Sequence, residues 1–369
     1  MTGFGNRLRV AVFPGDGIGP EVMRPCLAVL DRALARAGGP AVDWLELPAG
    51  AGAYRSTGDA LPTASLAEAR RADAILLAAM GDPTVRYPDG REMTPQIDLR
   101  MELGLYAGVR PVRSIAGIGG PLSDPRAARL DFVIIRESTE GLFAHFRDGE
   151  IEGDNAAHDR LTITRAGSER VIDFAFRLAA ERAGGGERRP LLTLVDKANV
   201  FRSYAFMRRI FDERAAKFPA VATSRIYVDA MAMEMVRRPW TFDVVVTENM
   251  FGDILSDLGA GLIGGLGFAP SADIGDEHAV FQPCHGTAPD IAGKGIANPT
   301  AMILSGAMML EWLAERAGAR QTAIAGRLVR AAVDDAFAGG GLVPFELGGT
   351  ADTAVIGAAV LAALDRVEV

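Results

Sequence analysis

Residues 242–259, FDVVVTENMFGDILSDLG, decide the fold class of this chain. The stretch begins with an apolar, β-branched run that is typical of a buried strand. After Asn249 the apolar residues recur at helical spacing, which predicts a helix directly after the strand. Apolar strand runs recur at residues 74–79 and 131–136 and alternate with helical patterns. This alternation indicates an α/β fold.

Two carboxylates share one face of the predicted helix. Asp253 and Asp257 lie four residues apart, and the helix contains no Lys or Arg to neutralise them. Ile254, Leu255 and Leu258 are predicted to form the apolar face. A solvated acidic face near a helix N-terminus is one interpretation. A site for Mg²⁺ or Mn²⁺ is the other, because hard cations prefer oxygen ligands.

Length and composition limit the function classes. The chain has 369 residues, 49% of them hydrophobic, and single cores rarely grow beyond roughly 250–300 residues, so two domains are expected. The net charge of -8 argues against general nucleic-acid binding. No apolar run approaches the ~20 residues of a membrane span, and no signal-peptide pattern is present. With only two cysteines, no disulfide framework is expected, and a cytoplasmic protein is predicted.

A glycine-rich turn follows the first predicted strand. The segment PGDGIGPE, residues 14–21, has glycines at positions 15, 17 and 19. The third glycine is therefore misplaced for a dinucleotide fingerprint, and Pro20 occupies its position. Pro20 and Glu21 instead suit the first turn of a helix. A standard Rossmann site is not expected.

Cationic side chains gather beside the predicted strands. Arg100, Arg110 and Arg136 together suggest a pocket for a di- or tricarboxylate, because guanidinium pairs bidentately with carboxylate. Lys197 follows an apolar strand, at the kind of strand end where α/β sites collect. Asp229 is also predicted to end a strand, so it adds a third oxygen ligand to the acidic pair. Acid-binding arginines, a lysine base and a metal site form one coherent set.

Several segments along the chain then carry a known pattern. They are PGDGIGPE at 14–21, LR at 99–100, VRP at 109–111, IRESTEG at 135–141, DKAN at 196–199, YVDAM at 227–231, NMFGDILSD at 249–257 and HGTAPDIAGKGIANP at 285–299. In these segments, and over nearly its whole length, the sequence resembles the isocitrate/isopropylmalate/tartrate dehydrogenase family. These are metal-dependent, β-decarboxylating dehydrogenases of 2-hydroxy acids.

The resemblance implies a fold. It is an isopropylmalate-dehydrogenase-like, two-domain α/β fold with a mixed sheet. A first domain on the cofactor side would comprise residues 1–106 plus 265–369. A second domain, residues 107–264, would hold the dimer interface and the metal and substrate residues. The polar tract at about 146–165 would be an arm that clasps the partner in a homodimer.

The resemblance also implies roles for the charged residues. Arg100, Arg110 and Arg136 are expected to bind the carboxylates of a malate-type substrate. Lys197 is expected to act, through water, as the base on the C2 hydroxyl. Lys197 and Asp229 would come from the neighbouring subunit, so that the active sites are shared. The expected ligands of Mg²⁺ or Mn²⁺ are Asp229, Asp253 and Asp257.

The expected cofactor is NAD. In the loop after His285, the carboxylate of Asp290 is expected to accept a hydrogen bond from the adenosine ribose and to repel a 2′-phosphate. NADP-specific relatives have a lysine there. The expected cofactor-binding residues are His285, Gly286, Thr287, Ala288, Pro289, Asp290 and Asn298.

Two departures from the family pattern leave the proton donor and the substrate open. Phe143 occupies the position of the family's catalytic tyrosine and carries no proton donor. His145 is one candidate replacement; protonation by water and oxidation without decarboxylation are alternatives. Thr94 and Gln96 lie where isopropylmalate enzymes have apolar residues, and an unpaired buried amide costs about 1–3 kcal/mol. A polar or small C3 substituent is therefore favoured, as in D-malate, tartrate, isocitrate or an analogue.

Three competing functions remain. The alternatives to the main prediction are a 3-isopropylmalate dehydrogenase and a non-catalytic regulatory subunit of the same family. A binding module for anionic metabolites is a third class, which predicts binding without metal dependence. Retention of Lys197, Asp229, Asp253 and Asp257 favours an active enzyme over the non-catalytic classes, whereas Phe143 is a mild argument against one.

Overall fold

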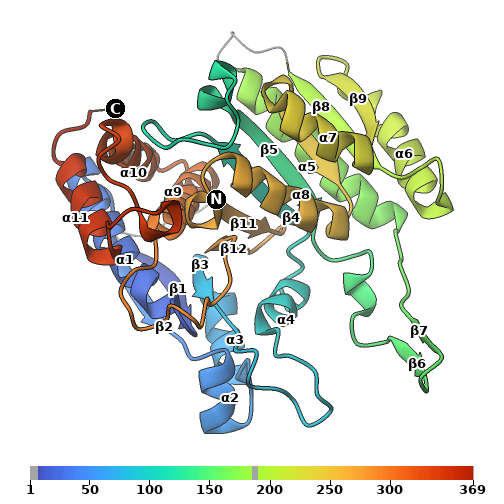
Figure 1. Cartoon of the computed structure of the whole chain (residues 1–369), viewed down its shortest axis with the longest axis horizontal. Coiled ribbons are helices and arrows are strands. Elements are labelled where there is room, and N and C mark those ends of the chain that lie inside the picture. Colours follow the sequence, from blue (N-terminus) through green and yellow to red (C-terminus); the bar gives the residue numbers. More distant parts are fainter. Residues whose placement is uncertain (1–6, 185–189, 369) are drawn as a thin grey trace.

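The computed structural model describes residues 7–184 and 190–368, which build one ten-stranded sheet flanked by helices (Figure 1). In spatial order its strands are β2 (Ala41–Glu46), β1 (Arg7–Gly15), β3 (Ala74–Ala79), β12 (Ala279–Pro283), β11 (Pro270–Ile274), β4 (Ala107–Arg113), β5 (Asp131–Glu137), β10 (Val244–Thr247), β8 (Leu191–Asp196) and β9 (Ala222–Tyr227). Two parallel runs, β2-β1-β3-β12 and β5-β10-β8-β9, are joined by antiparallel pairing through β11 and β4. The predicted mixed α/β sheet is confirmed.

The two halves of the sheet come from different parts of the chain. The half that contains β1 and β12 is built from both chain ends, and the half that contains β5 and β9 is built from the middle. The division into two domains remains a prediction. Its predicted boundaries also take in residues 1–6, 185–189 and 369, which lie outside the described residues.

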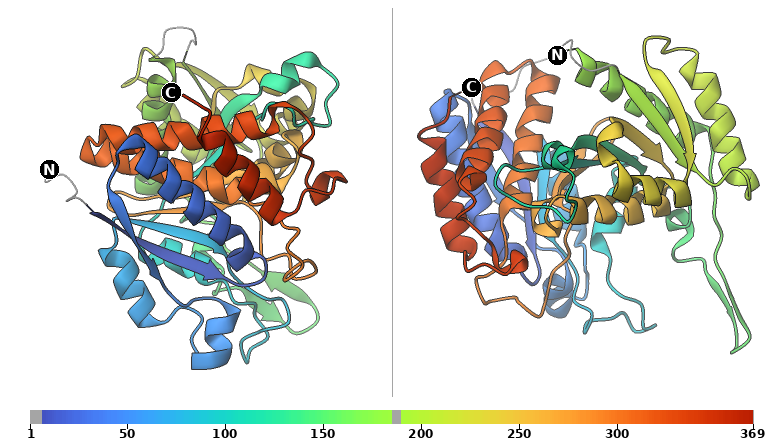
Figure 2. Two further views of the ribbon diagram at one scale, coloured as in Figure 1. Left: turned by 90° about the vertical axis from the view of Figure 1, so that its left-hand side faces the viewer. Right: turned by 45° about the horizontal axis from the view of Figure 1, so that its top comes forward.

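Helices cover both faces of the sheet (Figure 2). They are α1 (Gly19–Ala37), α2 (Ala51–Thr57), α3 (Thr63–Arg71), α4 (Pro95–Glu102), α5 (Arg165–Ala183), α6 (Arg202–Ala215), α7 (Val228–Arg237), α8 (Asn249–Leu262), α9 (Thr300–Ala317), α10 (Arg320–Ala338) and α11 (Thr353–Leu364). The helices α1, α9, α10 and α11 pack together beside the first half, and α5 and α6 pack together beside the second. None of the helices in the described part of the chain is long and apolar enough to cross a membrane.

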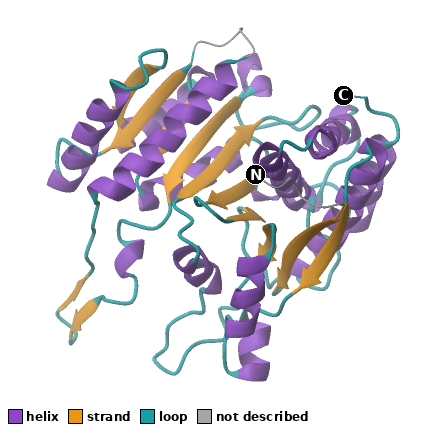
Figure 3. Cartoon of the chain, turned by 180° about the vertical axis from the view of Figure 1, so that it is seen from behind, coloured by secondary structure: helices purple, strands orange, loops and turns teal. Residues whose placement is uncertain are grey.

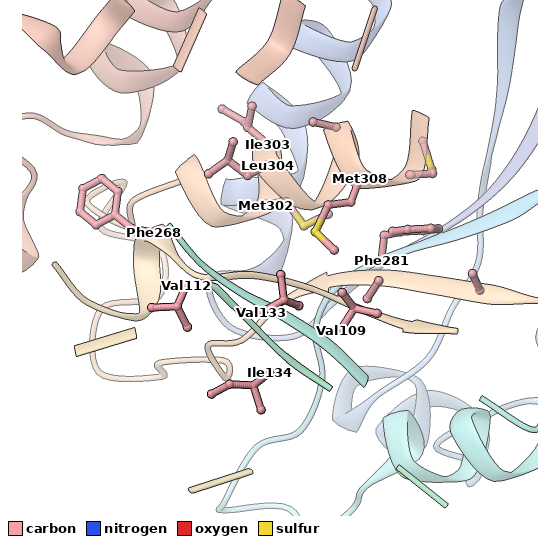
Figure 4. Close-up of a cluster of buried hydrophobic side chains, with 14 of the residues drawn as sticks. Val109, Val112, Val133, Ile134, Phe268, Phe281, Met302, Ile303, Leu304 and Met308 are labelled. Carbon is pink, nitrogen blue, oxygen red and sulfur yellow. The ribbon is translucent and has the colours of Figure 1, made fainter. Parts of the chain in front are cut away.

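The methionine-rich helix α9 belongs to the core. Met302 and Met308 are buried, and Figure 4 shows them above Val109 and Val133 on the central strands. Flexible, polarisable Met side chains fill irregular gaps of this kind. A helix that is apolar on nearly all sides is thus explained by packing rather than by ligand binding.

Two local predictions are wrong in detail. Ile254, predicted on the apolar face of α8, is 61% exposed, whereas Leu255 is buried. Asp229 does not end a strand: β9 stops at Tyr227, and Asp229 lies in the first turn of α7. A carboxylate is stabilised there by the positive end of the helix dipole.

The polar tract after Phe146 forms a projecting hairpin. Its strands β6 (Glu150–Glu152) and β7 (Ala156–His158) pair antiparallel, apart from the main sheet (Figure 3). Ile151, in the middle of β6, is 80% exposed. An isolated two-stranded hairpin is marginally stable in water, so this shape suits an arm that rests on another surface.

Candidate active site

A cavity of about 220 Å³ lies where the two halves of the sheet meet. Its wall comes from β3, α4, β4, β5, α8 and the loop after β12. Ligands of open α/β sheets bind at such crevices beyond the strand ends. The polar and aromatic residues of the wall include Gln96, Arg100, Arg110, Arg136, Phe143, Asp253, Ser256, Asp257, Gln282, Cys284 and His285.

The three predicted arginines come together in this cavity. Arg100, Arg110 and Arg136 are only 5%, 6% and 3% exposed. The antiparallel register of β4 and β5 sets Gly108 opposite Arg136, which puts Arg110 on the same face as Arg136. Burial, and then the charge of Arg100, lower the pKa of Arg136 to about 10. So much positive charge at one buried site favours an anionic ligand.

Arg136 is tied to helix α8. Its Nε donates to Asn249 Oδ1 at 2.8 Å, and its Nη1 forms an ion pair with Asp253. Asn249 is itself fixed, because its Nδ2 donates to the carbonyl of Glu140 at 2.9 Å. Phe143 covers the guanidinium, with Cζ of Arg136 4.9 Å from the ring centroid. Arg136 is therefore held in place before any ligand arrives.

Helix α8 presents the predicted acidic pair to the cavity. Asp253 and Asp257 both line it, one helical turn apart. Burial, and then the charge of Asp253, raise the pKa of Asp257. The helix begins at a buried carboxylate, Glu248, which accepts hydrogen bonds from the backbone N–H groups of Met250 and Phe251. Two carboxylates on one cavity wall fit the oxygen-ligand preference of Mg²⁺ or Mn²⁺.

Lys197 and Asp229 form a separate cluster. Lys197 Nζ lies 2.5 Å from Asp229 Oδ1, and this hydrogen bond lowers the pKa of Asp229. Neither residue lines the cavity. Within residues 7–184 and 190–368, no three His, Cys, Asp or Glu side chains are placed to hold one metal ion. A single chain thus does not bring Asp229 to Asp253 and Asp257.

His145 is not brought to the cavity. Its Nε2 lies 2.9 Å from Thr162 Oγ1, and its Nδ1 lies 3.0 Å from Asp148 Oδ2 and 2.8 Å from Arg160 Nη2. These contacts hold the root of the hairpin arm, and Phe143, two residues earlier, is the one that lines the cavity. Both ring nitrogens of His145 are thus engaged away from the cavity of the same chain, and its role as a proton donor stays a prediction.

Thr94 and Gln96 differ in position. Thr94 is the residue before α4 and does not line the cavity. Gln96 does line it, and its Oε1 is buried with no hydrogen-bond partner in the described chain. An unpaired buried amide oxygen calls for a donor from a ligand or water.

The predicted cofactor loop crosses the glycine turn after β1. Ile18 N donates to Thr287 O at 2.9 Å, and a Cβ at Gly17 would lie 2.1 Å from that oxygen. Gly17 also has a positive φ of 59°, so only glycine suits this approach. The glycine turn of residues 14–21 thus packs against the cofactor loop and supports it.

Members of the predicted cofactor set lie along this loop. His285 and Gly286 line the cavity, and Nε2 of His285 is buried without a partner among the described residues. Ala288 has a positive φ of 39°, and Asp290 is exposed farther along the loop. Asn298 lies two residues before α9, and its Oδ1 accepts from Thr300 N at 3.1 Å. Because Nε2 of His285 has no partner in the described part of the chain and the neighbouring loop is partly exposed, a bound cofactor could supply the missing hydrogen bond.

Three residues whose side chains contact the side chains of the arginines were not predicted. Asn249 orients Arg136, Cys284 lies 3.6 Å from Arg110 Nη1, and Asp273 on β11 bonds to Arg100. Asp273 had a signal in the sequence, because a lone acid inside an apolar strand needs a buried partner.

Comparisons with known proteins agree with this geometry. The model of the isocitrate/isopropylmalate dehydrogenase family matches residues 9–360. A 3-isopropylmalate dehydrogenase from Moorella thermoacetica is 43% identical over 311 residues, which cover 82% of this chain and 85% of that protein. A 3-isopropylmalate/3-methylmalate dehydrogenase from Methanocaldococcus jannaschii is 40% identical over 346 residues, 94% of this chain and 95% of that protein. The crystal structure of isocitrate dehydrogenase from Methylococcus capsulatus has a TM-score of 0.85 at 37% identity, over 97% of this chain and 100% of that one.

These matches confirm the predicted family, fold and cofactor class. The family oxidises the CH–OH group of a hydroxy acid and uses NAD with Mg²⁺ or Mn²⁺. The fit of Asp253, Asp257 and the loop after β12 to these groups is consistent with that chemistry. The chain therefore belongs to the isocitrate/isopropylmalate dehydrogenase family and is a metal-dependent, decarboxylating hydroxy-acid dehydrogenase.

Proposed function

We propose that this protein oxidises and decarboxylates a 3-substituted malate with NAD⁺, and that 3-isopropylmalate is its first candidate substrate. The observation that carries the proposal is the set of three buried arginines facing Asp253 and Asp257 across one cavity. The names of the most similar relatives favour 3-isopropylmalate over malate, tartrate or isocitrate. These names support 3-isopropylmalate dehydrogenase, the alternative stated in the sequence analysis, better than the main prediction of a substrate with a small or polar C3 substituent.

Arg100, Arg110 and Arg136 bind the two carboxylates of the malate group in this proposal. Asp253 and Asp257 hold Mg²⁺ or Mn²⁺, which when bound polarises the C2 oxygen and lowers the pKa of the hydroxyl. Residues 285–290 and Asn298 hold NAD⁺, which accepts the C2 hydride. Asp290, exposed on the loop, accepts a hydrogen bond from the adenosine ribose and repels a 2′-phosphate.

The base and third metal ligand come from a second copy of the chain in this proposal. Lys197 takes the proton of the C2 hydroxyl, and Asp229 completes the metal site. Support comes from two observations: neither Lys197 nor Asp229 lines the cavity of its own chain, and apolar side chains on α7 and α8 are exposed. Met233, Val236 and Ile254 are 49%, 50% and 61% exposed there. A homodimer buries them against the same face of its partner.

A substrate with a polar C3 substituent is the second candidate. It is favoured by one observation, the buried Oε1 of Gln96 that has no partner in the described chain. A hydroxyl or amide on the substituent would satisfy this oxygen, whereas an isopropyl group would leave it unpaired. The cost of about 1–3 kcal/mol corresponds to a loss in kcat/KM of about fivefold to 150-fold.

A substrate panel tests the proposal. The purified protein is incubated with NAD⁺, Mn²⁺ and, separately, 3-isopropylmalate, 3-methylmalate, D-malate, tartrate and isocitrate, and both NADH and CO₂ are measured. We expect the highest kcat/KM for 3-isopropylmalate, with one CO₂ released per NADH. A higher kcat/KM for tartrate supports the second candidate. If the folded protein forms no NADH with any of these acids, the proposal is contradicted. The regulatory subunit and the binding module are then the remaining alternatives.

A further inference from the structure

A carboxylate is buried directly behind the arginines of the cavity. Asp273 on β11 is 1% exposed. Its Oδ2 accepts hydrogen bonds from Arg100 Nη2 at 3.2 Å and from Gln282 Nε2 at 2.6 Å. Its Oδ1 accepts from Ser138 Oγ at 3.3 Å and lies 3.6 Å from Arg110 Nη2. Asp273 does not line the cavity, but three of these four partners do.

Asp273 remains ionised in this position. Burial alone raises its pKa, but the charges of Arg100, Arg110 and Arg136 outweigh burial and hold the pKa below its usual value. An isolated buried carboxylate would be strongly destabilising, whereas one that bridges two guanidiniums is compensated. The negative charge is therefore a permanent part of the cavity's surroundings near pH 7.

The charges around the cavity balance one another. Three guanidiniums and three carboxylates face or adjoin it, and the neighbouring His285 has its pKa lowered by burial. The six charged groups are Arg100, Arg110, Arg136, Asp253, Asp257 and Asp273. A divalent cation on the aspartates leaves an excess of two positive charges. Lys197 and Asp229, if a partner supplies them, cancel each other as long as Lys197 carries its proton.

We propose that Asp273 is a specificity-determining residue that matches the charge of the cavity to a dianion. A malate group with an uncharged C3 substituent carries two carboxylates and balances the site. A tricarboxylate such as isocitrate brings a third negative charge, which Asp273 leaves without a counter-charge. Without Asp273 the excess would be three, which suits a trianion.

This inference rests on the proposed function for the identity of the bound acids. It narrows that function to malates with an uncharged C3 substituent. Isocitrate, retained among the substrates predicted from the sequence, is disfavoured. The residue acts through Arg100 and Arg110 and touches no substrate, so its effect appears as charge selectivity in binding.

Ligand binding to the full-length protein with Mg²⁺ tests the role of Asp273. Calorimetry compares succinate, a dianion, with tricarballylate, a trianion, in the absence of NAD⁺. We expect the wild type to favour succinate and Asp273→Asn to shift the affinity ratio toward tricarballylate by roughly tenfold or more, because one uncompensated charge within about 12 Å contributes that much at an effective dielectric near 20. An unchanged ratio in Asp273→Asn overturns the proposal.

Two variants separate charge from structural damage. Asp273→Glu keeps the charge and is expected to retain the wild-type ratio. Asp334→Asn removes a carboxylate that pairs with Arg113 outside the cavity, and is expected to leave the ratio unchanged. If circular dichroism shows that Asp273→Asn does not fold, the wild type alone is used as the test. In that case, wild-type binding of tricarballylate that is as tight as, or tighter than, that of succinate overturns the proposal.

The same variants separate this inference from the proposed function. If the wild type oxidises no malate but prefers succinate and Asp273→Asn loses that preference, the function fails and the charge selection stands. If the wild type oxidises 3-isopropylmalate but Asp273→Asn does not change the ratio of succinate to tricarballylate affinity, the proposed function stands and the inference about Asp273 fails. In an active enzyme, Asp273→Asn is expected to raise kcat/KM for isocitrate relative to 3-isopropylmalate by roughly tenfold.

Discussion

Arg136 and Asp253 form an ion pair that joins the proposed substrate anchor to a proposed metal ligand. Their side chains differ in environment, since that of Arg136 is 4% exposed and that of Asp253 is 51% exposed. The buried partner is fixed by Asn249, so the carboxylate is the member that is free to move. Binding of a cation to Asp253 would therefore release one N–H edge of Arg136 for the substrate carboxylate.

Substitution Arg136→Lys is expected to lower kcat/KM for the hydroxy acid by about a hundredfold, since it removes roughly two charge-assisted hydrogen bonds. The ammonium of lysine keeps the charge but cannot bind Asn249 and a carboxylate together as a planar fork does. Steady-state kinetics measure the loss, which should fall mainly on KM. Arg113→Lys, on the same strand pair but outside the cavity, serves as the control. Equal losses in both variants would contradict a specific role for Arg136.

Phe143→Tyr is expected to raise kcat for decarboxylation by roughly tenfold or more, within the range of general acid catalysis. The phenylalanine ring already lies in the cavity wall against Arg136, so the added hydroxyl needs no new space for the ring. The ratio of CO₂ to NADH, measured for both proteins, shows whether the wild type completes decarboxylation. Phe146→Tyr, outside the cavity wall, should change neither value.

The sequence predicted the elements of the sheet well because their signals are local. The apolar run of β3 and the strand-to-helix change at Asn249 both appear at the expected residues. The three arginines could be grouped for the same reason, since each lies within or beside a recognisable element.

The missed features depend on contacts that no local pattern contains. Asp273 and Arg100 are 173 residues apart in sequence, and they meet only when β11 is paired with β4 and helix α4 lies beside them in the folded chain. Helical periodicity placed Ile254 on an apolar face but cannot tell a face covered by the same chain from an exposed one. Sequence spacing likewise cannot show that Asp229 and Asp253 lie apart in the folded chain.

Asp290→Lys is expected to reverse the cofactor preference. The wild type should use NAD⁺ with a higher kcat/KM than NADP⁺, because in the proposed binding mode the Asp290 carboxylate lies beside the ribose and repels a 2′-phosphate. A lysine there replaces repulsion with attraction, which at an effective dielectric near 20 changes the ratio by about a hundredfold. Asp290→Asn, which removes only the repulsion, should give an intermediate ratio. Equal kcat/KM for both cofactors in the wild type would count against the role of Asp290.

Glu137 predicts a pH dependence of stability. Its side chain is buried on the face of β5 opposite to Arg136, and burial raises its pKa to about 7. Above an ordinary pKa of about 4.3, the unfolded chain loses this proton while the folded protein keeps it up to about pH 7. The contribution of Glu137 is therefore complete at low pH and is lost as pH rises through 7. Glu137→Gln should flatten the fall of the urea midpoint between about pH 4 and 7, whereas Glu150→Gln on the exposed hairpin should not.

Hybrid dimers test whether the two charge clusters belong to one shared site. Lys197→Ala and Asp253→Ala each remove one cluster and should each be inactive as homodimers. After denaturation and joint refolding, half of the dimers are mixed, and each mixed dimer contains one site with both clusters intact. Activity should then recover to about a quarter of the wild-type value, as random pairing in a two-fold symmetric dimer requires.

The matched control mixes Asp253→Ala with Asp257→Ala, which lie on the same helix and damage the same half of each site. Every site in that mixture lacks one aspartate, so no recovery is expected. Recovery in both mixtures would reflect refolding rather than complementation. Absence of recovery in the first mixture, with mixed dimers verified by mass spectrometry, would show that Lys197 and Asp253 act within one chain.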